Sequence, residues 1–498
     1  MGKELSGKKI TKNVFISIAT QLISLALSFV MYMVVPKFIS EIDYAYWQTF
    51  VLYATNVTVL HFGLVDGIAL RYAKYDYNEL DKKLMRSQFT IMFALTVFFA
   101  SVLIVTAFFA TEGVSRILCV LIAASIITRN IVLYSTYTLQ ITNRISRYAA
   151  VIIAQKLVYG IIAVGLLMAK VGEFYWYCIA DLIGDLTVVV VSPFVNKGMY
   201  LGKTVGVKET FSEAGKNVAS GALLLTANYS AMLLTAGAKM IIQWRFDELT
   251  FGKVSFAFSV TNLFLTFVMA VSVVLFPSLK RMEEQKLSAI YKPVRETVSL
   301  FLFWVLILYF PGCMILSRWL PKYTESLPYL GILMPLMVFS SKVSLLTNNY
   351  LKVYRKEKLM LILNLCSAAA GVAWFVVAAY LIGSVTAVLI GVVAIIMINS
   401  VLSEYFVCKI TGVKLLKDFV SEFVMCAGFI VAVKLLPLLY AFAVYAVMLV
   451  IYSAINYKYF AGLFGKMRKR KNGAGDQNRG EEPEKNAEGE SGEEAEEK

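Results

Sequence analysis

The sequence contains little charge and few of the residues that build metal sites. Charged residues make up 16% of the 498 and hydrophobic residues 59%. A soluble domain averages about 25% charged and about 45–50% apolar residues. This composition excludes an ordinary soluble domain and predicts an integral membrane protein. There is one histidine, and the cysteines form no Cys-x-x-Cys pair, so we predict neither a zinc site nor a disulfide framework. The sequence also has no P-loop motif, and we predict no cofactor.

The apolar residues are arranged in repeated runs of about 17–25 residues, the length of a helix that spans about 30 Å of hydrocarbon. Val, Ile, Leu and Phe occur in unbroken clusters rather than in the alternation that marks a transmembrane barrel. We therefore predict an all-α polytopic membrane protein with about 14 transmembrane helices. The last pair is the least regular, because Glu422 interrupts one run and Pro437 lies in a very short turn. The predicted spans are 13–35, 45–66, 87–110, 114–138, 148–169, 174–192, 217–239, 251–275, 295–317, 327–350, 359–381, 385–407, 418–435 and 437–457.

The net charge of +15 would suggest nucleic-acid binding in a soluble chain, but its distribution has another explanation. Basic residues gather in alternate loops and at both termini, including Lys466–Lys471. Cytoplasmic loops of membrane proteins carry this excess of Lys and Arg. We predict a multi-pass protein of the cytoplasmic membrane with both termini cytoplasmic and with no nucleic-acid partner.

A polar stretch rich in lysine and glycine, Pro193–Lys216, separates two strongly hydrophobic blocks. The first block opens with Lys12-Asn13-Val14 and the second with Lys216-Asn217-Val218. Parallel repeats joined by a cytoplasmic connection are a known transporter plan. The predicted organisation is a six-helix bundle (1–192), a cytoplasmic linker (193–216), a second six-helix bundle (217–407), two extra transmembrane helices (408–465), and a disordered charged tail (466–498) whose composition cannot support a core.

Several short patches resemble one known family. Gln21 in the first apolar run, Pro36 after it, the Gly63-Leu64 element and the Arg71-Tyr72 pair stand where that family has the same residues. Gly252–Ala257 and Phe276–Leu279 are similar to the opening and exit of its eighth helix, although Val254 replaces the usual tyrosine. The chain thus resembles the polysaccharide-transporter family, the lipid-linked oligosaccharide flippases of the multidrug/oligosaccharidyl-lipid/polysaccharide exporter superfamily. The resemblance implies a transporter rather than an enzyme.

Ionisable residues inside predicted spans are the candidate functional residues, because each costs about 2.5–3.5 kcal/mol at the centre of a span and should face protein or water. Four cations, Lys342, Arg129, Lys156 and Lys239, could line a central cavity and bind a lipid diphosphate. Lys342 is the strongest candidate, because its own span contains no carboxylate. Asp181 and Asp185, one helical turn apart, are candidates for ion coupling. Alternatively, they pair with Arg129 or Lys156 to hold helices together, and Lys239 snorkels to the interface.

The leading hypothesis is a flippase that moves a polyprenyl-diphosphate-linked oligosaccharide across the membrane by alternating access, for cell-surface polysaccharide synthesis. Its expected partners are the lipid-linked glycan, membrane lipids, a polysaccharide polymerase and glycosyltransferases. A cation or drug antiporter of the same superfamily is the first alternative, although it would need an acidic cavity. A membrane glycosyltransferase or polymerase is the second, but the predicted outer loops are short and carry only scattered acids such as Glu112 and Asp247.

Overall fold

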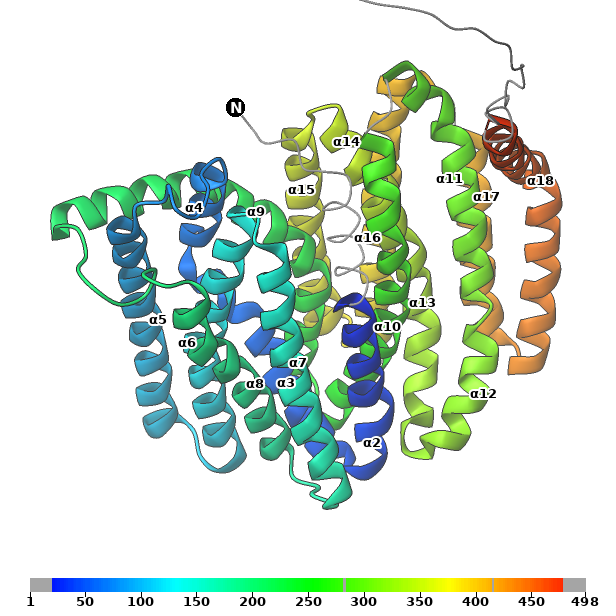
Figure 1. Ribbon diagram of the computed structural model, residues 1–498. Helices are drawn as coiled ribbons and strands as arrows, with labels where there is room; N and C mark the ends of the chain where they lie inside the picture. The colour runs from blue at the N-terminus through cyan, green and yellow to red at the C-terminus, as the bar shows by residue number, and fades with distance from the viewer. Residues whose placement is uncertain (1–19, 281–283, 414–415, 478–498) are drawn as a thin grey trace, which may run out of the picture.

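The protein is a bundle of membrane-length helices in a computed structural model that describes residues 20–280, 284–413 and 416–477 (Figure 1). Over these residues every regular element is a helix, which confirms the predicted all-α class. Eleven described helices are long and apolar enough to cross a membrane, or twelve if one bent pair is a single span. Helices α10 and α17 occupy two further predicted spans but are not among these, so the count of 14 stays a prediction.

In the first half, the helix of the first span, Thr20–Phe38, ends in η1 (Val30–Val34) and α2 (Val35–Phe38). The elements that follow it are α3 (Glu41–Asn56), η2 (Val57–His61), α4 (Leu64–Tyr72), α5 (Lys82–Ala110), α6 (Gly113–Ile141), α7 (Ile145–Met168) and α8 (Phe174–Val195).

The second half begins with the long helix α9 (Val207–Arg245). It continues with α10 (Glu248–Lys280), α11 (Glu284–Leu306), α12 (Tyr309–Trp319), η3 (Pro321–Ser326), α13 (Leu327–Lys342), η4 (Val343–Thr347), α14 (Asn348–Val353), α15 (Glu357–Val376), η5 (Val377–Leu381), α16 (Val385–Thr411), α17 (Leu416–Leu435) and α18 (Leu438–Gln477). Figure 1 shows α4, α5 and α6 on one side and α11, α17 and α18 on the other, with α2 between them. We call the end of the molecule that carries loops 142–144 and 196–206, predicted to be cytoplasmic, the inner end, and the opposite end the outer end.

Several helices begin at residues whose side chains cap the free backbone N–H groups of the first turn. The Ser40 hydroxyl accepts a hydrogen bond from the Asp43 N–H at 3.1 Å, and Asp81 accepts from the Lys83 N–H at 2.8 Å. Such caps contribute about 1 kcal/mol each. At the end of α16, Gly412 adopts the left-handed conformation that commonly terminates a helix. These short-range signals explain where the apolar runs become helices.

The second predicted span, 45–66, is not one straight helix. It breaks at Phe62 and Gly63, whose φ angles are +51° and +85°. The helix axis bends by 58° at this break. Glycine suits this left-handed backbone. Beyond the break α4 crosses α9 at backbone contact, since a Cβ added at Gly67 would lie 1.8 Å from the Asn217 carbonyl oxygen and one at Gly221 2.0 Å from the Gly63 carbonyl oxygen. Small residues allow this close approach.

The predicted linker 193–216 is only partly irregular, because α8 continues to Val195 and α9 already begins at Val207. The first turns of α9 lie across the inner ends of α4 and α5 (Figure 1). Arg71 anchors them by contacting Asn217 and Glu213, each at 2.6 Å. Further along, α9 contacts α15 of the second half. The connection is therefore a helix shared by both halves rather than a flexible tether.

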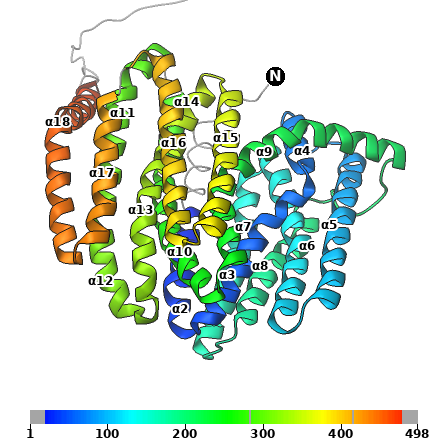
Figure 2. The ribbon, with the colours of Figure 1, turned by 180° about the vertical axis from the view of Figure 1, so that it is seen from behind.

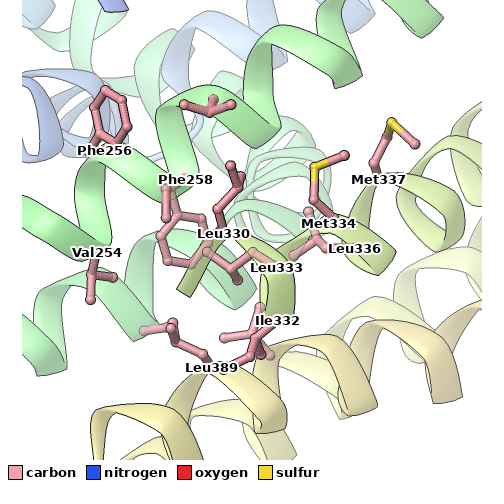
Figure 3. Close-up of a cluster of buried hydrophobic side chains, with 14 of the residues drawn as sticks. Val254, Phe256, Phe258, Leu330, Ile332, Leu333, Met334, Leu336, Met337 and Leu389 are labelled. Carbon is pink, nitrogen blue, oxygen red and sulfur yellow. The ribbon is translucent and has the colours of Figure 1, made fainter. Parts of the chain in front are cut away.

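The core of the second half is packed by α10, α13 and α16, whose apolar side chains interdigitate (Figure 3). Helices α17 and α18 lie at the edge in both views (Figures 1 and 2). Helix α18 continues to Gln477, so the first residues of the predicted tail belong to a helix, and the disordered tail stays a prediction. The rest of the predicted tail, 478–498, lies outside the described residues.

Candidate functional site

A polar cavity of about 660 Å³ lies within the first half. Its walls come from the first-span helix, α3, α6, α7 and α8, and Thr266 of α10 closes one side. The lining extends from Trp47 on α3 to Tyr148, near the inner start of α7. Arg129, Lys156 and Asp181, all from the middle of their helices, are part of the wall. The cavity therefore reaches the depth at which an ionisable side chain is most costly and most often functional.

Arg129 is the central ion of this cavity. Its Nη2 contacts Asp181 Oδ2 on α8, and its Nε lies 2.9 Å from Asp185 Oδ2, one turn further along the same helix. Arg129 and Asp181 remain 27% and 19% exposed, whereas Asp185 is fully buried. The structure thus brings together three of the residues proposed from the sequence. It also realises the alternative in which the two aspartates pair with Arg129.

Two neighbouring residues on α7 complete the polar wall. Gln155 donates a hydrogen bond from Nε2 to Asp185 Oδ1 at 2.6 Å. Lys156 lines the cavity as well, and no hydrogen bond or ion pair of its ammonium group is found among the described residues. Two cations and two carboxylates therefore share the site, and the ammonium of Lys156 is the charge least engaged by the protein itself.

Aromatic side chains close the cavity toward the outer end. Trp47 packs edge-on against Tyr44 at a centroid distance of 5.7 Å. Tyr44 in turn contacts Tyr323 of η3 at 5.3 Å and Phe256 of α10 at 6.2 Å. Nearby, α3 and α10 touch, since a Cβ added at Gly252 would lie 2.9 Å from Ala45 Cβ. The halves are therefore packed together at the outer end.

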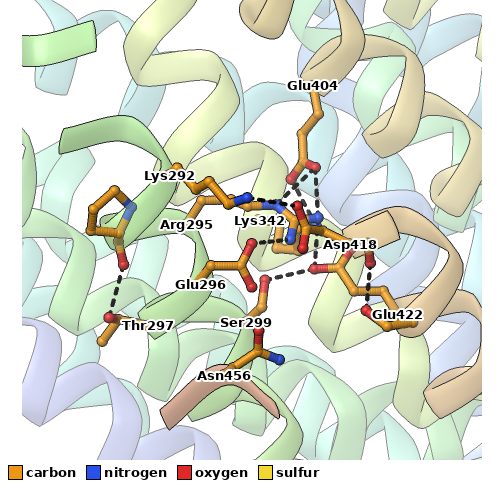
Figure 4. Close-up of polar contacts among 12 residues, drawn as sticks. Lys292, Arg295, Glu296, Thr297, Ser299, Lys342, Glu404, Asp418, Glu422 and Asn456 are labelled. Carbon is orange, nitrogen blue, oxygen red and sulfur yellow. Dashed lines mark hydrogen bonds and ion pairs between the residues drawn. The ribbon is translucent and has the colours of Figure 1, made fainter. Parts of the chain in front are cut away.

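The structure does not place Lys342 at this cavity. Lys342 lies in the second half at the end of α13, where its Nζ is 2.5 Å from Glu422 of α17 and 2.8 Å from Glu404 of α16 (Figure 4). The expectation that Lys342 has no carboxylate partner is therefore wrong. Its own span contains no carboxylate, but two neighbouring helices supply one each.

Lys239 is also not among the residues that line the cavity. It lies on the part of α9 that approaches the outer end, half-buried, with its Nζ 5.9 Å from the ring centroid of Phe251. This position agrees with the alternative in which a long side chain covers apolar surface and extends toward the interface.

Sequence reasoning missed several residues at these sites. Gln155 was not singled out, because an uncharged amide gives no signal within a span. Glu404 did carry a signal, as an ionisable residue inside the predicted span 385–407. Arg295 and Glu296 are the first two residues of the predicted span 295–317, where charged residues are typical of a loop next to a span. Among the described residues, no group of His, Cys, Asp and Glu side chains could hold a metal ion.

The fold is that of transporters of the MOP superfamily, as comparison with solved structures shows. One match is described as "Lipid II flippase MurJ, inward closed conformation", with a TM-score of 0.60 at 12% identity over 90% of this chain and 99% of that chain. Another is the "Inward-facing conformation of a multidrug resistance MATE family transporter of the MOP superfamily", with a TM-score of 0.58 at 11% identity over 79% and 94%. The outward-facing conformation of such a MATE transporter matches with a TM-score of 0.51 at 12% identity over 80% and 96%. No family model and no curated protein matches the sequence.

Proposed function

We propose that this protein is a flippase that moves a polyprenyl-diphosphate-linked oligosaccharide across the cytoplasmic membrane by alternating access. The observation that carries the proposal is the mid-depth cavity with Lys156 and Arg129 in its wall. A diphosphate needs such cations, with Arg acting as a bidentate fork and Lys as a point charge. The glycan would occupy the polar space and the polyprenyl chain would remain in lipid.

The arrangement of charges suggests an order of events. Lys156 is accessible from the cavity without breaking an ion pair, so it makes the first contact with the diphosphate. Arg129 then exchanges Asp181 for a phosphate oxygen, while Asp185 and Gln155 keep the arginine in place from the buried side. Protonation of Asp181 would favour this exchange, which is the ion-coupling role expected of the aspartates.

The conformation supports loading from the inner end. The outer end is closed by the contacts of Tyr44 with Tyr323 and Phe256, while the cavity lining continues to Tyr148 near the inner end. Once the sugar faces the outside, a polymerase or glycosyltransferases would consume it.

An antiporter for organic cations is a second candidate, and one observation favours it. Asp181 lines the cavity and is partly exposed, so a cationic substrate could displace Arg129 from it. The MATE structures share the fold as the flippase does. The sign of the charge that the cavity binds therefore separates the two candidates.

Deleting the gene and following both substrates distinguishes the candidates in cells. The flippase account expects lipid-linked precursor to accumulate on the inner leaflet while resistance to toxic cations is unchanged. Complementation with Lys156→Ala should restore export only weakly, whereas Lys203→Ala, a lysine in the inner loop 196–206, should restore it fully. Normal export combined with lost cation resistance would replace the flippase by the antiporter.

A further inference from the structure

The second half contains a closed group of ions that the proposed transport step does not use. We call Arg295, Glu296, Lys342, Glu404 and Glu422 the buried ion cluster (Figure 4). Their side chains are all between 0% and 2% exposed. They come from α11, α13, α16 and α17, on the part of each helix that approaches the inner end.

The charges of the buried ion cluster do not balance. Three carboxylates face two cations, so the cluster carries one excess negative charge if every glutamate is ionised. An uncompensated ion in a low-dielectric interior costs several kcal/mol. A buried carboxyl group usually avoids this cost by binding a proton. The question is then which glutamate holds it.

Two of the three glutamates are well compensated. Glu422 lies 2.8 Å from Arg295 and 2.5 Å from Lys342, and it accepts a hydrogen bond from Ser299 at 2.8 Å. Glu404 lies 3.2 Å from Arg295 and 2.8 Å from Lys342. Each of them therefore interacts with both cations.

Glu296 differs from the other two. Its Oε1 accepts a hydrogen bond from Arg295 Nη1 at 2.8 Å, and Arg295 is shared with both other glutamates. Its Oε2 is buried, and neither a hydrogen bond nor an ion pair of this atom is found among the described residues. Glu404 Oε1 also lacks a hydrogen bond in this part of the chain, but it lies 2.8 Å from Lys342 Nζ. On α18, the buried hydroxyl of Tyr452 also lacks a partner within the described part of the chain, and it lies near enough to interact electrostatically with Glu422 and, less strongly, with Glu296.

We propose that the buried ion cluster binds one proton, carried on Glu296, and exchanges it with the solution at the inner end. The other charged groups near Glu296 are Lys292 and Arg295 on its own helix, Lys342 on α13, Glu404 on α16, and Asp418 and Glu422 on α17. The Lys292–Asp418 ion pair, at 3.6 Å, is 31% and 17% exposed and lies nearer the inner ends of α11 and α17 than Arg295 and Glu422 do. This partly exposed pair lies between the buried ion cluster and the inner end.

This inference does not depend on the transported substrate, because it concerns a carboxyl group and not the cavity. Infrared spectroscopy of the purified full-length protein tests it, since a protonated carboxyl group has a carbonyl stretch that a carboxylate lacks. At neutral pH, well above the usual glutamate pKa of about 4.3, the wild type should show this band. The difference spectrum between the wild type and Glu296→Gln should contain one such band. The difference spectrum for Glu325→Gln, a control at an exposed glutamate, should contain none.

A wild type without a protonated-carboxyl band at neutral pH would overturn the proposal, as would a band that is unchanged in Glu296→Gln. If the glutamine variant does not fold, Glu296→Asp provides the second test, because it keeps an ionisable group in a slightly different position. The band should then shift in frequency. An unshifted band in Glu296→Asp would assign the proton to another residue and would also overturn the proposal.

Discussion

Each half of the molecule contains a group of ions inside the membrane-length helices, and the two groups have different surroundings. In the first half, Arg129 and Asp181 border a cavity and are 27% and 19% exposed. In the second half, Arg295 and Lys342 are 0% and 1% exposed. Both groups contain cations and carboxylates that come from several helices and form ion pairs with one another.

The comparison shows that an ionisable residue in a span does not by itself indicate a binding site. Ions that border a cavity can exchange a protein partner for a ligand, because water and substrate reach them. Ions closed off by packing can only hold helices together or bind a proton, because breaking a buried pair leaves an uncompensated charge. Exposure to the cavity therefore decides which cations we assign to the substrate.

Lys342→Ala should have the largest effect of these substitutions, and the property that it changes is the stability of the fold. Removing Nζ leaves Glu404 and Glu422 with only Arg295, and breaking a buried pair in this way costs about 3–5 kcal/mol. We expect a strong loss of folded protein in the membrane and a lower thermal unfolding midpoint in detergent. The matched control is Lys156→Ala, which removes the same group at the cavity and should keep the wild-type midpoint. Equal midpoints for the two variants would remove the distinction between the clusters.

Arg129→Ala should abolish export and cause a smaller loss of stability. Asp185, which is fully buried, loses its ion pair but keeps its hydrogen bond from Gln155, and Asp181 can be solvated by the cavity. Leaving a buried charged group without a partner costs more than the about 1–3 kcal/mol of a neutral group. Because Asp185 keeps hydrogen bonds from Gln155 and Thr128, the unfolding midpoint should lie between those of Lys342→Ala and the wild type. Export near the wild-type level would exclude Arg129 from the substrate site.

Lys156→Ala should reduce export without affecting stability. Hydrogen bonds to charged groups contribute about 1.5–3 kcal/mol, which corresponds to a fall of about 10- to 100-fold in affinity for the diphosphate. Export measured at limiting precursor reports this fall, with Lys203→Ala as the control. An equal decrease in both lysine variants would point to a surface-charge effect instead.

Lys239→Ala should have the smallest effect. The half-buried side chain lies beside Phe251, and no ion pair or hydrogen bond of its ammonium group is found among the described residues, so its removal breaks no such contact. Export and the unfolding midpoint should both match the wild type. A clear loss of export would return Lys239 to the list of substrate-binding residues.

Much of the fold could be predicted from the sequence, because hydrophobic run length and charge distribution are local properties. The apolar runs predict the helical class, and the left-handed Gly383 and the cap at Ser384 agree with the predicted boundary between 359–381 and 385–407. The break at Phe62–Gly63 could not be predicted from the apolar runs. It depends on the close contact of α4 with α9, a helix that is distant in the sequence.

The site was predictable only in part, for the same reason. Arg129, Lys156 and Asp181 stand out as charges within spans, and the structure places them at one cavity. Lys342 stands out equally, yet its partners Glu404 and Glu422 lie on other helices. Whether a cation in a span is free or paired depends on helix packing, which is not contained in the span's own sequence.

The most direct test of the account is equilibrium binding of a polyprenyl diphosphate to the purified protein, with an organic cation measured in parallel. We predict that the wild type and Lys203→Ala bind the diphosphate equally, and that Lys156→Ala binds it about 10- to 100-fold more weakly. Unchanged diphosphate affinity in Lys156→Ala, or binding of the organic cation in place of the diphosphate, would contradict the assignment of the first-half cavity to a lipid-linked glycan.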